Sequence, residues 1–539
     1  MTTDPIEPLE RFAAVRRELE ARWPETQISP TLARIRTLTQ YLGDPQRAFP
    51  VIHVTGTNGK TSTARMIEAL LRSFGLHTGL ITSPHLADLR ERIRLDGESI
   101  ELTDFLRVYD EVAPVLAMAD QVSQAAGGPR LSFFEVMIGL GFAAFADAPV
   151  DVAVVEVGMG GTWDATNVAD AQVAVIMPVG MDHSDYLGDT LADIAGEKAG
   201  IIKPTSSVVL AAQELPAQQV LLAAALQLEA PTAMEGVHYA VVERVLAVGG
   251  QQVTLRGLGG DYSEVFLPLF GEHQARNAAA ALVAVESFFG LEPPELGDPL
   301  GLYPARIAAP AELSTARSVG TDSVDLRDPE PAVTTAADVP VAAPRRQLDP
   351  VVVRAGFASV TSPGRLEVVR RGPTVLVDAA HNVPGTQAMV AAVAESFTFT
   401  ATVAVVGILA GKDAAGILSA LDPIVDKVVI TRSSSPRAVP VAVLAEIAAD
   451  ILGEDRVEAV ERLDEALERG IGLAEAAAPA GVGAGVLVTG SVTMAAEARM
   501  LLGAESGSES GATRSEHAAP RGRAPDDLED LLDDYEDYR

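Results

Sequence analysis

Short apolar runs alternate along this chain with longer segments in which apolar residues recur at helical spacing. Such spacing predicts helices at 6–21, 31–42, 102–119, 132–146, 191–200, 216–228 and 274–289. Near-continuous apolar runs predict buried strands at 50–54, 77–82, 150–157, 173–179 and 207–211, and a small antiparallel patch is expected at 239–255. Strands that alternate with helices indicate an α/β fold with a mostly parallel sheet.

The pattern stops near residue 292 and resumes at 351. The intervening segment is rich in Pro, Ala, Asp, Ser and Thr and has no sustained period. A second alternation follows, with strands at 365–369, 374–378, 402–407, 427–431 and 485–490 and helices at 384–396, 414–421, 439–451 and 463–476. We therefore expect a P-loop-type domain at 1–293, a linker with a disordered insertion at 294–348, a smaller Rossmann-like α/β domain at 349–502 and a disordered acidic tail at 503–539.

Composition narrows the class of protein. A hydrophobic content of 48% with 21% charged residues is typical of a globular chain. The net charge of −33 argues against a nucleic-acid partner, and the absence of cysteine excludes disulfides and thiolate metal sites. No apolar run approaches the ~18 residues of a membrane span, and the N-terminal residues are acidic. We expect a soluble, cytoplasmic monomer that acts on small molecules, without membrane or nucleic-acid partners.

A phosphate-binding loop is predicted between the strand at 50–54 and the helix that follows it. Two glycines let the backbone N–H groups turn inward toward phosphate oxygens, a lysine reaches the β/γ-phosphates, and hydroxyls are available to phosphate or Mg²⁺. The longer pattern G-x-x-x-x-G-K-[ST] would need glycine where the chain has Val54. The alternative is a glycine turn that binds nothing. The expected nucleotide-binding residues are Gly56, Thr57, Asn58, Gly59, Lys60, Thr61 and Ser62.

Three polar residues follow predicted strands, where ligand groups gather in parallel sheets. Ser83 follows the strand at 77–82, Glu156 ends the strand at 150–157, and His183 comes soon after the strand at 173–179. A carboxylate in this position suits Mg²⁺, although it also suits a helix cap. Imidazole is an unusual Mg²⁺ ligand, and Lys198 alone reads as a solvated helix lysine.

An ordered series of motifs carries a family resemblance. The chain contains, in order, GTNGKTS, TSPHL, VEVGMGGTWDATN, MDHSDYLG, EKAGIIK, FGEHQARNA, SPGRLEVV, DAAHNVPG and VTGS. This series resembles folylpolyglutamate synthase/dihydrofolate synthase, a branch of the Mur ligase superfamily. The resemblance spans about 50–290 and 350–500 and implies a role in folate biosynthesis and one-carbon metabolism.

The resemblance also implies roles for single residues. Ser83 and Glu156 would hold one Mg²⁺ and His183 a second, while Lys198 would be carbamylated. A monovalent cation is retained as a further candidate ligand. ATP would be contacted by Asn277, Arg365 and Asp378, the glutamate side would be served by His381 and Ser491, and pteroate would contact Ser132, Phe133, Phe134 and Glu135.

The chain departs from the family pattern at two places. Many members have Arg-Leu where this chain has Thr162-Trp163, so an arginine contact is lost there or supplied elsewhere. Thr61 stands where many members have a third glycine. Neither change removes a residue that the implied mechanism needs.

The implied activity is that of an ATP-dependent amide ligase. A carboxylate of dihydropteroate or of a reduced folate attacks the γ-phosphate, and the amine of L-glutamate then attacks the acyl phosphate. The nearest alternative is a Mur-type ligase for peptidoglycan precursors, which usually places a nucleotide-sugar domain of ~100 residues before the loop; only 55 residues precede Gly56. A nucleotide-switched binding module or transport ATPase would not need the DAAHN and SPGR motifs.

Overall fold

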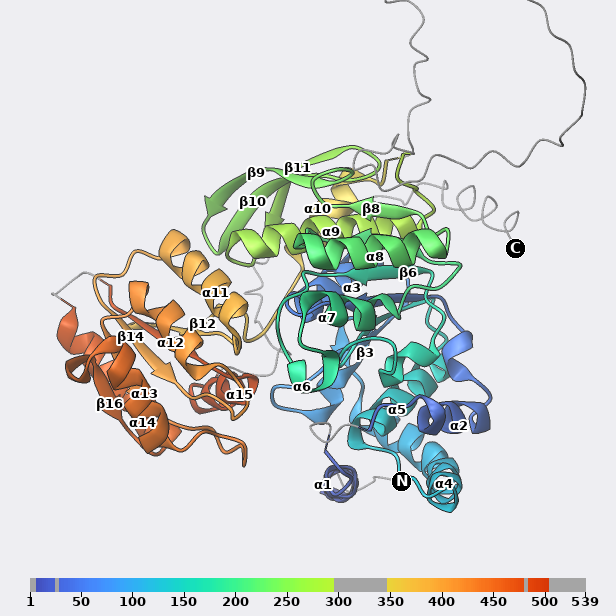
Figure 1. The fold of residues 1–539 in the computed structure, drawn as a ribbon, viewed down its shortest axis with the longest axis horizontal. Helices are drawn as coiled ribbons and strands as arrows, with labels where there is room; N and C mark the ends of the chain where they lie inside the picture. Colours follow the sequence, from blue (N-terminus) through green and yellow to red (C-terminus); the bar gives the residue numbers. More distant parts are fainter. Residues whose placement is uncertain (1–5, 25–28, 295–346, 479–482, 504–539) are drawn as a thin grey trace, which may run out of the picture. The chain divides into compact units, whose positions relative to one another are not determined.

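The computed structural model describes residues 6–24, 29–294, 347–478 and 483–503, and the expected insertion and tail lie almost entirely outside them (Figure 1). Two mostly parallel sheets, each accompanied by helices, confirm the predicted fold class. Within the described residues, no helix combines the length and the apolar character that crossing a membrane requires.

The larger sheet has the strand order β4-β3-β2-β5-β1-β6-β7-β8. The pairs β2–β3 and β3–β4 are antiparallel and the other neighbours are parallel. β1 therefore lies at the centre, between β5 and β6. The strands are β1 (Val51–Thr55), β2 (Thr78–Ile81), β3 (Ile93–Leu95), β4 (Glu98–Ser99), β5 (Val152–Glu156), β6 (Val173–Ile176), β7 (Ser207–Leu210) and β8 (Thr232–Met234).

Helices cover both faces of this sheet because successive side chains of a strand point to opposite faces. On β1, Ile52 and Val54 belong to a core with α3 and α9, whereas Val51 belongs to a core with α4 and α5. His53 and Thr55 share the parity of Val51. The helices are α1 (Ile6–Glu20), α2 (Ala33–Tyr41), α3 (Lys60–Ser73), α4 (Leu102–Ala125), α5 (Phe133–Asp147), α6 (Ser184–Leu187), α7 (Leu191–Ala199), α8 (Leu215–Gln227) and α9 (Glu272–Phe288).

A small antiparallel sheet of β9 (Ala240–Ala247), β10 (Gly250–Arg256) and β11 (Asp261–Leu267) follows. The sequence pattern predicted the first two strands and missed β11. Helix α10 (Pro350–Ala358) contacts α3 and β11, and its Val353 and Phe357 are fully buried in the core around α3. The expected boundary at 349 grouped this helix with the second sheet, whereas its apolar side chains pack with the first.

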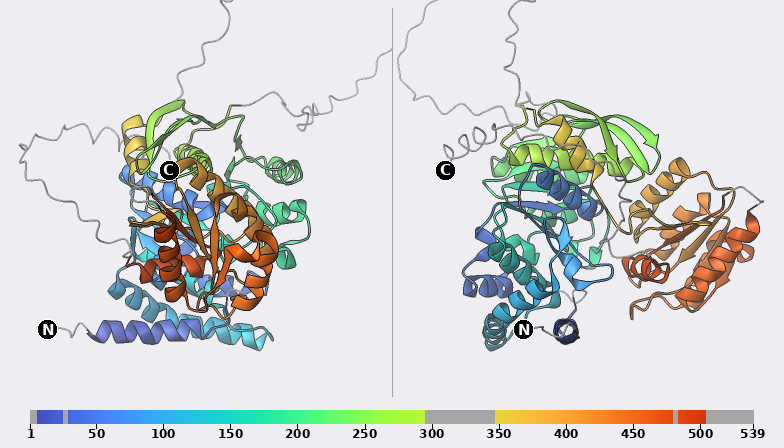
Figure 2. Two further views of the ribbon diagram at one scale, coloured as in Figure 1. Left: turned by 90° about the vertical axis from the view of Figure 1, so that its left-hand side faces the viewer. Right: turned by 180° about the vertical axis from the view of Figure 1, so that it is seen from behind.

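The second sheet has the order β12-β13-β17-β14-β15-β16, and only the β12–β13 pair of the described strands is antiparallel. Its helices lie on both faces (Figure 2). The sequence pattern missed β16 and α15. The elements are β12 (Glu367–Arg371), β13 (Thr374–Val377), α11 (Val383–Ser396), β14 (Thr402–Val406), α12 (Ala414–Leu421), β15 (Lys427–Ile430), α13 (Val441–Leu452), β16 (Val457–Ala459), α14 (Leu463–Ala477), β17 (Gly485–Thr489) and α15 (Val492–Leu501).

Candidate functional site

The loop between β1 and α3 depends on its two glycines. Gly56 has φ +143° and Gly59 has φ +85°, which L side chains rarely adopt. A Cβ at Gly56 would lie 2.6 Å from the Cβ of Met177, and one at Gly59 would lie 2.7 Å from Oδ1 of Asn277. The backbone can therefore pass close to both neighbours only because these positions lack a side chain.

Two lysines converge on this loop. Lys60 Nζ donates to the carbonyl oxygens of Gly56 and Thr57 at 3.1 and 3.0 Å, and Lys198 Nζ donates to the same Gly56 oxygen at 2.8 Å. Burial lowers the pKa of Lys60. Burial, reinforced by the charge of Lys60, lowers the pKa of Lys198 to about 7. In the part of the chain that the structure describes, neither lysine forms an ion pair, but the carboxylates of Glu156 and Asp182 lie near enough to oppose the lowering of the Lys60 pKa.

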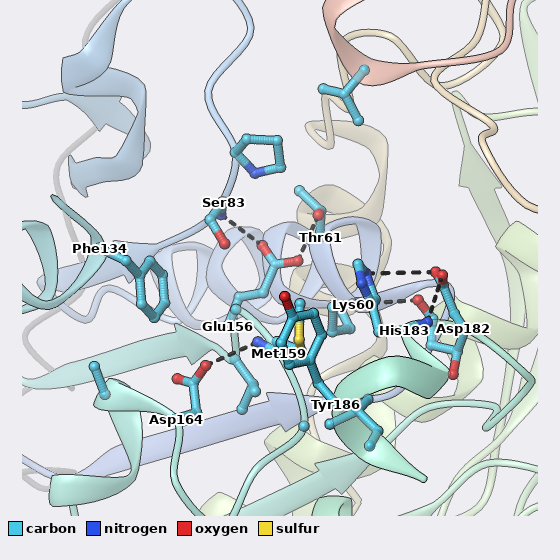
Figure 3. Close-up of a pocket in the computed structure, with 18 of the residues that line it drawn as sticks. Lys60, Thr61, Ser83, Phe134, Glu156, Met159, Asp164, Asp182, His183 and Tyr186 are labelled. Carbon is cyan, nitrogen blue, oxygen red and sulfur yellow. Dashed lines mark hydrogen bonds and ion pairs between the residues drawn. The ribbon is translucent and has the colours of Figure 1, made fainter. Parts of the chain in front are cut away.

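Glu156 is held between the loop helix and the segment after β2 (Figure 3). Thr61 Oγ1 donates to its Oε1 at 2.8 Å, and the backbone N–H of Ser83 donates to its Oε2 at 3.1 Å. The residue is 1% exposed, and burial raises the pKa of its carboxyl against the opposing effect of Lys60.

The oxygen donors around Glu156 fit Mg²⁺. A buried carboxylate and the hydroxyl of Thr61 meet at one point, and oxygen is the donor that Mg²⁺ prefers. Across the described residues, no cluster of three or more His, Asp or Glu side chains is positioned to hold a metal ion. Mg²⁺ in nucleotide sites commonly takes one or two carboxylates and completes its shell with phosphates and water, so this sparse donor set is sufficient.

His183 and Asp182 lie after β6, on the other side of Lys60 from Phe134 (Figure 3). Burial lowers the pKa of His183 to about 4, so its imidazole is neutral at pH 7. Lys412 Nζ donates to Oδ1 of Asp182 at 2.6 Å. Burial alone would raise the pKa of Asp182, but His183 and Lys412 outweigh it and hold this pKa well below its usual range.

Residues from the second sheet reach the same place. Asn382 Nδ2 donates to Oδ1 of Asn58 at 3.1 Å and to Oδ2 of Asp182 at 3.3 Å. His381 Nδ1 lies 2.9 Å from the carbonyl oxygen of Ala379, and burial lowers the pKa of His381 to about 4. Ser491 caps α15, since its Oγ accepts from the backbone N–H at position 494 at 3.1 Å.

Sequence reasoning singled out neither Asp182, Asn382 nor Lys412 as site residues. The first two stand beside selected residues in the motifs MDHSDYLG and DAAHNVPG, and that adjacency was the available signal. Lys412 lies outside the family motifs, between DAAHNVPG and VTGS. Its role becomes visible only through its ion pair with Asp182.

The expected nucleotide residues Asn277, Arg365 and Asp378 line a second cavity of about 140 Å³. Asn277 Nδ2 donates to Oε1 of Gln274 at 3.1 Å. The carboxylate of Asp378 accepts from the backbone N–H groups of residues 366 and 380 at 2.8 Å each, and burial raises its pKa. Asp378 therefore fixes the backbone next to Arg365, which lines both cavities.

The segment Ser132–Glu135 divides into different roles. Ser132 Oγ accepts from the N–H of Glu135 at 3.1 Å, and the Glu135 carboxylate accepts from the N–H of Ser132 at 2.7 Å and from Arg34 at 3.0 Å. This capping box starts α5. Phe134 lines the main cavity, whereas Phe133 is buried in the core with the guanidinium carbon of Arg92 5.0 Å from its ring centre.

One cavity of about 490 Å³ brings most of the predicted residues together. Ser62, Asn277 and Asp378 line the second cavity instead, and Phe133 lines neither. Trp23, Arg34 and Trp163 are lining residues that sequence reasoning did not select. The predicted residues on the main cavity are Gly56, Thr57, Asn58, Gly59, Lys60, Thr61, Ser83, Ser132, Phe134, Glu135, Glu156, His183, Lys198, Arg365, His381 and Ser491.

Two family models match the chain. The Mur ligase middle domain matches residues 54–118 and 133–285, and the Mur ligase glutamate ligase domain matches residues 364–492. The first match contains the glycine loop, and the second contains the strands β12 to β17 of the smaller sheet.

The known proteins that the chain is similar to include several folylpolyglutamate synthases. The dihydrofolate synthase/folylpolyglutamate synthase of Mycobacterium tuberculosis is 46% identical over 90% of this chain and 92% of its own length. A crystal structure of the Mycobacterium tuberculosis folylpolyglutamate synthase complexed with ADP and AMPPCP matches with a TM-score of 0.78 and 44% identity, over 92% of this chain and 99% of that one. A folylpolyglutamate synthase complex with AMPPCP and folate matches with a TM-score of 0.67 and 27% identity, over 92% of this chain and 99% of that one.

Proposed function

The chain belongs to the folylpolyglutamate synthase/dihydrofolate synthase family of Mur ligases, and we propose on this basis that it is an ATP-dependent ligase that adds L-glutamate to dihydropteroate, to reduced folates or to both. The observation that carries the proposal is the main cavity, where the glycine loop and its two lysines face residues of the second sheet. The Mur-type alternative shares only the superfamily with the relatives found.

Phosphoryl transfer in this site depends on positioning and positive charge. The loop N–H groups and Lys60 would hold the β/γ-phosphates, with Asn277 and Arg365 on the nucleotide. The substrate carboxylate attacks the γ-phosphorus and ADP leaves, which gives an acyl phosphate. Mg²⁺ held by Glu156 and Ser83, with a second ion near His183, would neutralise charge on the phosphates when bound.

Lys198 is suited to carbamylation. Its pKa of about 7 leaves much of the amine neutral near pH 7, and only a neutral amine attacks CO₂. The neutral amine forms an N–C bond to CO₂ and gives up one proton, so a neutral amine becomes a carbamate anion. That anion would offset the positive charge that Lys60 concentrates at the carbonyl of Gly56.

The glutamate amine must be neutral to attack the acyl phosphate. His381 and Ser491 line the cavity, and His381 is neutral because burial lowers its pKa to about 4. A neutral imidazole next to the amine can accept a hydrogen bond or a proton from it. We assign the glutamate side of the site to these two residues, with Lys412 and Asp182 beside them.

Water competes with glutamate for the acyl phosphate, which explains a site built from two sheets. We propose that the ranges 1–293 and 349–502 form two domains that close over ATP, except that helix α10, at the start of the second range, packs on the first domain. A cytoplasmic location and a monomeric state, expected from the sequence, remain part of this proposal.

An assay of phosphate release tests the function. Dihydropteroate and tetrahydrofolate are offered separately, each with ATP and with or without L-glutamate. We expect release that depends strictly on both L-glutamate and at least one pterin substrate, with a product heavier by one glutamate. A nucleotide-sugar peptidoglycan precursor serves as the acceptor of the rival reaction. Release with that acceptor, or release that needs no acceptor, would contradict the proposal.

A further inference from the structure

A buried histidine lies on the central strand, outside the set of residues that the proposed mechanism uses. His53 is fully buried on β1, and its Nε2 lies 2.8 Å from Oγ1 of Thr166, which is also fully buried. Thr166 belongs to the short helical turn Ala165–Val168. Thr55, the other polar residue of β1, donates from Oγ1 to the carbonyl oxygen of Gly160 at 2.8 Å, so both polar side chains of the strand reach the segment between β5 and β6.

The direction of the hydrogen bonds follows from the next partner. Thr166 Oγ1 donates to Oδ1 of Asp164 at 2.5 Å, and a hydroxyl has only one hydrogen to donate. The Thr166 oxygen must therefore accept from His53, which places the ring proton on Nε2. Burial lowers the pKa of His53 to about 3, so the ring is neutral. Its Nδ1 has no hydrogen-bond partner among the described residues.

The far end of this chain of hydrogen bonds holds a loop at the cavity wall. The Asp164 carboxylate also accepts from the N–H of Thr166 at 3.0 Å and from the N–H of Met159 at 2.9 Å. Packing around the same loop is tight, since a Cβ at Gly158 would lie 2.5 Å from the ring of Phe134. The placement of residues 158–161 therefore sets where this ring can lie.

This arrangement does not serve stability alone. A buried imidazole with one unpaired nitrogen costs free energy that an apolar residue would not. Val51, Ile52 and Val54 of β1 are apolar, and the two polar residues of the strand, His53 and Thr55, both form hydrogen bonds to the segment after β5. His53 therefore carries a cost that positioning of the loop explains.

We propose that His53 is a positioning residue for the pterin substrate, acting through Thr166 and Asp164 on the 158–161 loop beside Phe134. This inference rests on the proposed function. Phe134 and Asp164 lie on one side of Glu156, whereas Lys60 and His183 lie on the other (Figure 3). The network therefore faces the part of the cavity away from the phosphate loop, and the half-buried Trp163 lines the same cavity. A flat heteroaromatic ring can stack on aromatic side chains such as these.

The test compares His53→Leu with His53→Gln. Leucine removes the donor, whereas the amide nitrogen of glutamine can take the place of Nε2. We expect His53→Leu to raise the KM for the pterin substrate about tenfold, with the KM for ATP changed less than about twofold. Glutamine should restore most of the loss. Leucine should also leave the melting temperature unchanged or higher, which a purely structural role for the histidine would not produce.

A second pair keeps the proposal testable if His53→Leu fails to fold. Thr166→Val removes the hydroxyl with nearly the same shape, and Thr166→Ser retains it. We expect the valine variant to show the same selective KM effect and the serine variant to resemble the wild type. Equal effects on all substrates, no recovery by glutamine or serine, or an unchanged pterin KM would each overturn the proposal. An inactive wild-type enzyme would instead contradict the proposed function, so the two failures are distinguishable.

Discussion

The amine of Lys198 donates a 2.8 Å hydrogen bond to the carbonyl oxygen of Gly56, a residue 142 positions earlier in the chain. Because Lys60 bonds to the same oxygen, the glycine loop sits between two amines. Burial lowers the pKa of both, and that of Lys198 falls to about 7. The charge of the Lys198 side chain therefore acts directly on the glycine loop, next to that of Lys60.

Lys198→Ala should reduce glutamate-dependent turnover at least about a hundredfold, since it removes the group that we expect to become a carbamate. Added short carboxylic acids should restore part of the activity by occupying the space left free. Lys203→Ala is the matched control, because Lys203 also has a pKa lowered by burial but lines neither cavity. Full activity of Lys198→Ala without added acid would contradict the role.

The carbamate should form faster as the pH rises through 7. Below pH 7 Lys198 is mainly an ammonium ion, which does not attack CO₂, and above pH 7 the neutral amine predominates. When the concentration of dissolved CO₂ is held equal at each pH, enzyme freed of CO₂ should therefore regain activity more quickly at pH 8 than at pH 6. A carbamate carbon signal in NMR spectra recorded with labelled bicarbonate provides a direct measurement, and Lys198→Ala should lack that signal.

Lys60→Ala should abolish glutamate-dependent phosphate release while the protein remains folded. Lys60 donates hydrogen bonds to two loop carbonyl oxygens and pairs with no carboxylate in the described residues. Its removal should therefore weaken phosphate binding more than it lowers the stability of the fold. Circular dichroism and melting temperature measure the fold, and phosphate release measures the function. Lys427→Ala, on β15, is the control for loss of a lysine. Turnover at the wild-type rate would rule out the assignment of the loop.

Glu156→Gln should raise the Mg²⁺ concentration needed for half-maximal activity. The amide oxygen of glutamine can replace one of the two carboxylate oxygens that accept from Thr61 and Ser83, but glutamine lacks the charge that attracts the ion. Glu68→Gln is the matched control, because Glu68 is a buried carboxylate on α3 that accepts from Thr78 and lies outside both cavities. A Mg²⁺ dependence equal to that of the control would argue against a ligand role for Glu156.

Asp182 and Lys412 should behave as a coupled pair. Both side chains are 12% exposed, and their 2.6 Å ion pair joins the loop after β6 to the loop after β14. Asp182→Asn and Lys412→Met should each lower kcat/KM for glutamate, and the double variant should lose less than the sum. We expect a coupling energy of about 1–3 kcal/mol from the double-mutant cycle. Strict additivity of the two losses would show that the residues are not coupled and would contradict this prediction.

Many residues of the candidate site could be predicted from the sequence because they lie in short local motifs. The strand-loop-helix pattern located Gly56–Ser62, and the rule that ligands gather at the carboxyl ends of parallel strands located Ser83, Glu156 and His183. The missed elements are short or lack a marked period, so local patterns could not separate them from loops; they include β3, β4, β8, β11, β16, α6, α10 and α15.

Other features depend on residues far apart in the chain. The ion pair of Asp182 with Lys412 spans 230 positions, and the hydrogen bond from Asn382 to Asn58 spans 324. The same holds for helix α10, which the sequence pattern did not predict and whose Phe357 is buried in the core around α3.

The sequence by itself determined the fold class, the glycine loop and the family, because strand and helix periods, glycine positions and ordered motifs are properties of consecutive residues. Only the tertiary structure decided that Phe133 turns into the core while Phe134 lines the cavity, that Lys198 shares a carbonyl with Lys60, and that His53 reaches Asp164 through Thr166. Burial and hydrogen bonding between distant segments set these outcomes, and they exist only once the chain has folded.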